Sequence, residues 1–207
     1  MAADQLAGTG EGQLAWARAV FAVNDLCQIA AEAESVEGVY DAALTALERA
    51  IGVERSSILV FDRQGVMRFG AWRGLSKTYR MAVDGHSPWS ADAKDPEPIL
   101  VPDVALDPEL AALCPVFDAE GIVALAFIPL IHGGRLLGKF MLYYDTPHPF
   151  AEEEIRVASS IAQFVAGAVD RKRNEVELRR SREHLSLALD AGAMGIWEWD
   201  IATGEVV

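Results

Sequence analysis

Apolar residues recur at helical spacing (i, i+3, i+4) over two stretches near the N-terminus, residues 14–33 and 36–51. Ser35 and Gly52 flank the second stretch, and residues of these types cap the start and the end of helices. The first stretch is apolar on more than one side, so a single packing surface would not cover it. We therefore predict two helices, which follow a disordered tail over residues 1–13.

From residue 56 the pattern changes to short runs of branched and aromatic residues, which predicts strands. Two of these runs flank Arg63-Gln64-Gly65 and two more flank His132-Gly133-Gly134, and both tripeptides are typical of hairpin turns. The run Ile58-Leu59-Val60-Phe61 is apolar at every position, so we expect this strand to be covered on both faces. The predicted strands span residues 56–62, 66–73, 99–101, 122–131 and 135–144.

The segment between the two hairpins is polar and contains several prolines. Within it we predict a short helix over residues 76–83. Asp107 followed by Pro108 predicts a second helix start, Pro115 a break in that helix, and Gly121 its end. Two helices, a hairpin, this irregular excursion and a second hairpin together predict an α+β fold with an antiparallel sheet.

The longest helical pattern begins in the acidic turn Glu152-Glu153-Glu154, and no proline follows it in the chain. A heptad register that starts at Ile161 places Leu178 and Leu185 on one seam, together with several charged residues. We predict that this helix ends the first domain at about residue 170. It then continues as a charged signalling helix or linker over residues 171–190.

Both terminal helical patterns carry more apolar surface than one face of a sheet can cover. Burying apolar surface stabilises an assembly by roughly 25 cal/mol per Å². We therefore expect a homodimer that forms through residues 14–33 and 155–189.

The composition narrows the classes of function. The chain has 207 residues, of which 51% are apolar and 24% are charged, so it can form one domain with a sizeable core and part of a second. A net charge of −13 argues against broad contact with nucleic acid, although residues 170–184 hold six of the 18 basic residues. No apolar run reaches the roughly 20 residues that cross a bilayer, and two cysteines form no disulfide framework. We expect a cytoplasmic protein with no nucleic-acid or membrane partner.

Several short segments carry a resemblance to the GAF domain family. They are Ile99-Leu100-Val101-Pro102-Asp103-Val104, Glu120-Gly121-Ile122 followed by Ala126-Phe127-Ile128-Pro129-Leu130, and Gly134-Arg135-Leu136-Leu137-Gly138. The resemblance covers about residues 22–170, and we assign residues 14–170 to a GAF sensor domain. It implies a six-stranded antiparallel sheet flanked by helices, with long N- and C-terminal helices. It also implies a ligand cavity on one face of the sheet and a dimer that forms through the terminal helices.

The end of the chain resembles the opening of a PAS domain, carried by residues 187–200 and Thr203-Gly204-Glu205. We therefore assign residues 191–207 to a truncated PAS domain. A GAF domain joined to a PAS domain by a charged helix is similar to the sensory half of bacterial sensor histidine kinases and, less often, of cyclic-di-GMP synthases and hydrolases. The resemblance implies a regulatory segment without catalytic residues, which acts on downstream PAS and kinase domains and a response regulator.

The resemblance places the closure of the ligand pocket at residues 84–89. Small-molecule sites combine an apolar wall with a few polar groups. The candidate ligand-binding residues are Trp72, His86, Trp89, Asp103, Cys114, Phe117 and Phe127. The cofactor is unknown. In the alternative, Trp89 fills the core, His86 bonds to the backbone, and the domain is a ligand-free dimerisation module and spacer.

Several chemistries known in the family lack their residues here. Cys114 is followed by Pro115 and not by the histidine common at bilin attachment sites, and we find no cyclic-nucleotide motif of the family. Methionine sulfoxide reductases of this fold need several cysteines at the pocket. His184 is followed by Leu185 and so lacks the acidic residue that follows the phosphoacceptor histidine of histidine kinases, and no residues have metal-ligand spacing. Haem ligation through His86 or His132 stays open.

Overall fold

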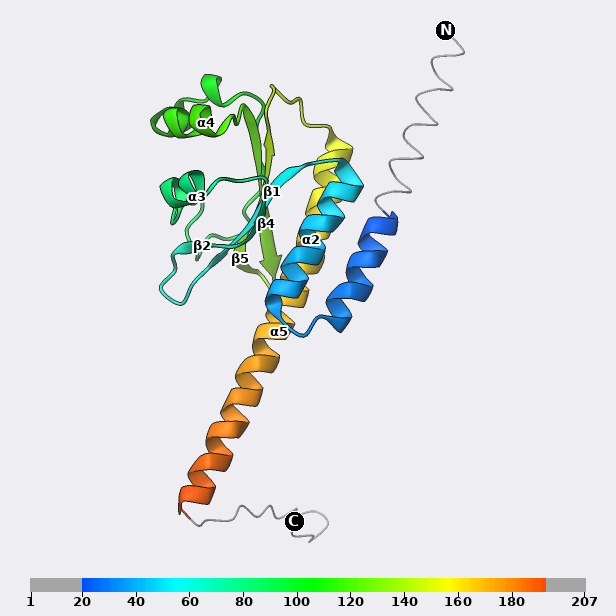
Figure 1. Cartoon of the computed structure of the whole chain (residues 1–207), viewed down its shortest axis with the longest axis vertical. Coiled ribbons are helices and arrows are strands. Elements are labelled where there is room, and N and C mark those ends of the chain that lie inside the picture. Colours follow the sequence, from blue (N-terminus) through cyan, green and yellow to red (C-terminus); the bar gives the residue numbers. More distant parts are fainter. Residues whose placement is uncertain (1–19, 193–207) are drawn as a thin grey trace. The chain divides into compact units, whose positions relative to one another are not determined.

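In a computed structural model of the chain, the described residues are 20–192 (Figure 1). A helix over residues 20–32 comes first. It is followed by α2 (Val36–Ile51), β1 (Arg55–Phe61), β2 (Met67–Arg73), α3 (Lys77–Val83), β3 (Ile99–Val101), the 3-10 helices η1 (Val104–Leu106) and η2 (Pro108–Leu113), α4 (Cys114–Glu120), β4 (Ala124–His132), β5 (Arg135–Tyr144) and α5 (Glu152–Gly192).

Local capping and turn chemistry set the ends of several elements. The Ser35 hydroxyl accepts the Gly38 N–H at 3.3 Å at the start of α2, and Gly52 ends this helix in the left-handed region with φ 73°. In the first hairpin the Asp62 carboxylate accepts two backbone N–H groups, and Gly65 has φ 77°. The predicted range of α2, both of its caps and this turn are therefore confirmed.

The sheet is antiparallel and has five strands in the order β2-β1-β5-β4-β3. The expectation of a six-stranded sheet is wrong for the described residues. The segment between α3 and β3 forms no strand, apart from one isolated bridge between Met67 and Gly85. Pro88, Pro96 and Pro98 lie in or at the end of this segment, and proline donates no hydrogen bond to a strand ladder.

The two faces of the sheet bury two separate clusters of apolar residues. On one face of the sheet, which we call the helix face, Phe140 and Leu142 of β5 pack with the helix over residues 20–32, with α2 and with the first part of α5. Figure 1 shows these helices on the same side of the sheet. On the opposite face, which we call the cavity face, Met141 and Tyr143 of β5 pack with α3, η1 and α4. Because side chains alternate along a strand, β5 connects the two clusters through a single backbone.

The segment between β2 and β4 contains α3, η1, η2 and α4, which cover the cavity face of the sheet. Ser76 caps α3 by accepting the Tyr79 N–H, and the Asp107 carboxylate accepts the Glu109 N–H at the start of η2. Pro108 occupies the first turn of η2, and Pro115 lies in the first turn of a new helix, α4, which begins at Cys114. The break predicted at Pro115 is confirmed, since the chain forms two helical pieces there.

The chain divides into two compact units, Met1–Asp170 and Arg171–Val207. Helix α5 begins in the predicted acidic turn at Glu152 and extends to Gly192. The N-terminal helix is shown over residues 20–32 only, and the predicted tail over residues 1–13 lies outside the described residues. The predicted PAS segment also lies outside them from residue 193 onward. Among residues 20–192 no helix is long and apolar enough to cross a membrane.

Candidate functional site

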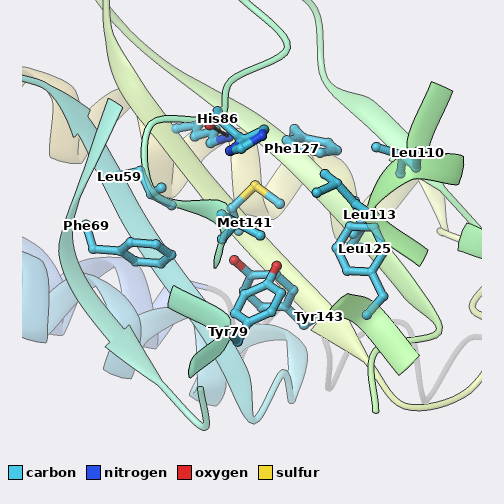
Figure 2. A pocket seen from close by; sticks show the side chains of 13 residues that line it. Leu59, Phe69, Tyr79, His86, Leu110, Leu113, Leu125, Phe127, Met141 and Tyr143 are labelled. Carbon is cyan, nitrogen blue, oxygen red and sulfur yellow. Dashed lines mark hydrogen bonds between the residues drawn. The ribbon is translucent and has the colours of Figure 1, made fainter. Parts of the chain in front are cut away.

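A cavity of about 40 Å³ lies on the cavity face of the sheet, beneath α3, η2 and α4 (Figure 2). We call it the central cavity. Its lining is drawn from seven elements and one loop and consists of Leu59, Phe69, Tyr79, Val83, His86, Leu110, Leu113, Phe117, Leu125, Phe127, Lys139, Met141 and Tyr143. A water molecule in a protein needs at least about 10–15 Å³ of such volume, so this space holds a few waters. A larger ligand would have to displace some of the lining.

The wall and the cover of the central cavity differ in how firmly they are held. Leu59, Leu125 and Met141 project from the sheet and are almost fully buried. Leu110 and Leu113 come from η2, a six-residue 3-10 helix that contains no fully buried residue. Elements with little buried surface move at the smallest free-energy cost. The cover formed by η2 is therefore the part of the lining best suited to give way to a ligand.

Lys139 is the one charged side chain among the described residues that line the central cavity. It is only 4% exposed. Its Nζ donates to the backbone oxygen of His86 at 3.1 Å and lies 4.9 Å from the centroid of the Phe127 ring. Burial lowers the pKa of Lys139 to about 7, because the charged form loses hydration. The lining includes no Asp or Glu that could balance the positive charge.

A second polar group of the lining is a pair of tyrosine hydroxyls, which Figure 2 shows close together beneath Met141. The Tyr143 hydroxyl hydrogen-bonds the Ser57 hydroxyl at 2.9 Å, and the rings of Tyr79 and Tyr143 meet edge to face at 5.8 Å. Burial raises the pKa of Tyr143 to about 12 and raises that of Tyr79 still further. Both hydroxyls therefore keep their protons near neutral pH and can donate hydrogen bonds.

Three of the seven predicted ligand-binding residues line the central cavity. Phe117 and Phe127 are buried in its wall, and His86 is exposed at its rim. Trp89 lies just outside the lining, where its ring meets the Phe127 ring edge to face at 6.4 Å. Trp72 is 42% exposed near the end of β2 and lies beneath the Arg80 guanidinium at 3.7 Å. The structure therefore groups some of the predicted aromatic residues around one space and places Trp72 apart from them.

The other two predicted residues have local partners outside the lining. The Asp103 carboxylate accepts the Ala105 N–H and caps η1. The Cys114 thiol donates to the backbone oxygens of Val104 and Leu110 at 3.7 and 3.6 Å. His132 ends β4 beside Gly167 of α5, also outside the lining. Among the described residues, no group of three His, Cys, Asp or Glu side chains could hold a metal ion.

The sequence analysis did not predict Lys139, Tyr79 and Tyr143, which supply polar atoms to the central cavity. A signal for Lys139 was present: it alternates with Met141 and Tyr143 within a strand whose other residues are mostly apolar. A lysine at such a position faces either solvent or a covered site. No comparable local signal marks Tyr79, because its place in the lining depends on how α3 packs.

A family model for GAF domains matches residues 33–170, more than half of the chain. The chain belongs to the GAF domain family. No curated protein matches this GAF domain. Among solved structures it is 47% identical to a domain from Sinorhizobium meliloti 1021 assigned by name to a two-component sensor histidine kinase. That match has a TM-score of 0.65 and covers 71% of this chain and 99% of the other.

Two more distant structures share the fold of this GAF domain. One is the GAF domain of a phosphoenolpyruvate-protein phosphotransferase from Coxiella burnetii, which is 20% identical, has a TM-score of 0.62 and matches over 77% of this chain and 97% of that one. The other comes from Pseudomonas syringae pv. tomato and is assigned by name to a sensor histidine kinase. It is 14% identical, has a TM-score of 0.62 and matches over 84% of this chain and 99% of that one. At these identities the two structures support the fold alone.

Proposed function

We propose that this GAF domain is the sensory segment of a cytoplasmic two-component sensor histidine kinase and that it passes the state of the central cavity to α5. The observation that carries this proposal is the 47% identity to a domain assigned by name to such a kinase, over 99% of that domain. In this proposal the segment has no catalytic residues of its own. It acts through downstream PAS and kinase domains on a response regulator.

The packing of β5 offers a physical route for the signal. Lys139, Met141 and Tyr143 line the central cavity, whereas Phe140 and Leu142 are fully buried against the helix face. The helix-face cluster includes Ala158, Ile161, Ala162 and Val165 of α5. A ligand that shifts β5 would therefore disturb close packing against α5, because protein interiors transmit strain.

The second candidate function is a ligand-free dimerisation domain and spacer. The observation that favours it is the volume of the central cavity, about 40 Å³, which is far below the roughly 300–1,000 Å³ of typical ligand pockets. Two measurements on the purified chain separate the two functions: a comparison of native and denaturing mass spectra, and a thermal-shift assay with added small molecules. A sensor is expected to retain a small molecule or to gain thermal stability with added ligands, whereas a spacer would do neither.

We expect the chain to be a homodimer through its terminal helices. Val20, Phe21 and Ile29 of the first helix are 45%, 70% and 47% exposed. Leu178 and Leu185, on the predicted heptad seam of α5, are 53% and 52% exposed. Light scattering at tens of micromolar should give twice the mass of one chain. A mass of one chain at that concentration would rule out this dimer.

We expect signalling through residues 170–184 to depend on helical phase. Each residue turns a helix by about 100°, so one inserted residue rotates everything beyond it, whereas seven nearly restore the original face. The ion pairs Lys172–Glu175 and Arg179–Glu183 favour a continuous helix in this segment. The chain would be fused through α5 to the catalytic half of a histidine kinase, with one to seven residues inserted after Asn174. Autophosphorylation should then vary periodically with insert length.

A flexible tether makes the opposite prediction for this insertion series. In that case all inserts would leave autophosphorylation at one level, since rotation about the tether would carry no information. Insertions of equal length after Asp92, in the loop between α3 and β3, serve as a control for the burden of added residues. A flat profile for the α5 series would refute transmission by helical phase.

A further inference from the structure

We propose that the central cavity takes a small organic monoanion with an apolar body, such as a monocarboxylate, and that Lys139 binds its charged end. This inference rests on the proposed sensory function and names the class of ligand for the same site. The ligand would lie along β5, with its carboxylate at the Lys139 Nζ and its apolar part against Met141 and Phe127.

The charge of the lining selects this class. Lys139 supplies one positive charge, and no acidic side chain among the described lining residues opposes it. Within residues 20–192, the hydrogen-bond acceptor that the structure gives for Lys139 is the neutral backbone oxygen of His86. A buried charge is stabilised by an opposite charge, and one lysine matches a monoanion better than a phosphate dianion, which needs several donors. In its protonated form Lys139 therefore gives the cavity a positive end that no acidic side chain of the lining balances.

The shape of the lining selects an apolar body for the ligand. Apart from Lys139, His86 and the two tyrosines, the residues that line the cavity are aliphatic, aromatic or Met. Lys139 and Tyr143 are four residues apart on β5, which corresponds to about 13 Å along a strand. The Tyr79 and Tyr143 hydroxyls therefore mark the limit of an apolar stretch that begins at Lys139.

Binding of the anion should also be coupled to the uptake of a proton by the protein. His86 from the loop after α3, Tyr79 from α3 and Tyr143 from β5 are the other titratable groups of the lining. Burial holds the pKa of Lys139 at about 7, so at pH 8 most of the empty protein carries a neutral amine. A bound carboxylate raises this pKa, since it favours the charged form. The protein should then take up close to one proton for each carboxylate bound at pH 8.

Matched pairs of probes test the proposal on the full chain. The pairs are isobutyrate with isobutyramide and benzoate with benzamide, which differ mainly in charge. Binding would be measured by thermal shift and by calorimetry in two buffers of different ionisation enthalpy. We expect at least one carboxylate to bind at least tenfold more tightly than its amide, because hydrogen bonds to charged groups are the stronger ones. The calorimetry should report proton uptake for the carboxylate and none for the amide.

Lys139→Met removes the charge and retains an unbranched side chain of similar length. This variant should lose the tenfold preference for the carboxylate and bind amide and carboxylate alike. Lys94→Met, at an exposed lysine in the loop before β3, is the matched control and should behave as the unmodified chain does. Should Lys139→Met fail to fold, Lys139→Gln, which also removes the charge, takes its place in the comparison of carboxylate with amide.

The outcomes separate this inference from the proposed function. Equal binding of both members of each pair, binding of neither carboxylate, or no proton uptake would overturn the assignment of a monoanion. A neutral molecule retained in native mass spectra would overturn it as well, while leaving the sensory function in place. Conversely, Lys139-dependent binding together with a flat insertion profile in α5 would keep the anion site and refute the signalling route.

Discussion

Replacing Gly138 with alanine is expected to lower the free energy of unfolding by about 4 kcal/mol or more. A Cβ at this position would lie 2.1 Å from the backbone oxygen of Leu59 and 2.8 Å from the Cα of Val60. Both atoms belong to β1, which pairs with β5 here. Backbone cannot move aside as the end of a flexible side chain can, so the two strands must separate. Urea unfolding followed by circular dichroism would measure the loss.

Gly38→Ala is the matched control for this change. Gly38 lies in the first turn of α2, and a Cβ there would lie 3.4 Å from the Ala33 Cβ, in ordinary contact. Alanine is favoured over glycine in a helix interior by up to about 1 kcal/mol, so this variant should be as stable as the unmodified chain or slightly more so. If Gly138→Ala stayed within about 0.5 kcal/mol of this control, the close approach of β1 and β5 would be wrong.

The second large effect is expected for Glu120→Ala, which should cost about 3 kcal/mol. Arg55 donates to the Glu120 carboxylate at 3.1 Å and also to the backbone oxygens of Gly74, Glu120 and Gly121. The same carboxylate accepts the N–H and the hydroxyl of Ser76, the residue that caps α3. The Glu120 side chain is 8% exposed and that of Arg55 21%, so removing one partner leaves a poorly solvated charge.

A double-mutant cycle would test this interpretation of the ion pair. Arg55→Met combined with Glu120→Met removes both charges, and the pair should be less destabilised than the sum of the single variants. Glu109→Ala serves as the control, because Glu109 is exposed on η2, and it should change stability by less than about 0.5 kcal/mol. Strictly additive losses in the cycle would mean that the two side chains act independently.

The sequence by itself predicted those elements whose ends depend on neighbouring residues. The helix at residues 36–51, the strand at residues 99–101 and the start of α5 at Glu152 are as expected. Capping by Ser35 and the turn at Gly65 involve groups no more than four residues apart. Such interactions depend only on residues that are close together in the sequence, so a sequence pattern contains the information needed to place them. The membership in the GAF family was likewise visible in short segments of the sequence.

The tertiary structure alone decided the number of strands and which side chains surround the central cavity. The lining comes from residues as far apart in the chain as Leu59 and Tyr143, and the cover from η2 fixes its volume. The alternation along β5 placed Lys139, Met141 and Tyr143 on one face, but did not say whether that face meets water or a covered space. That depends on non-local packing of α3, η2 and α4. Lys139 itself is buried where the loop after α3 brings the backbone oxygen of His86 within hydrogen-bond distance, and this non-local contact makes a strand lysine the charged end of a cavity.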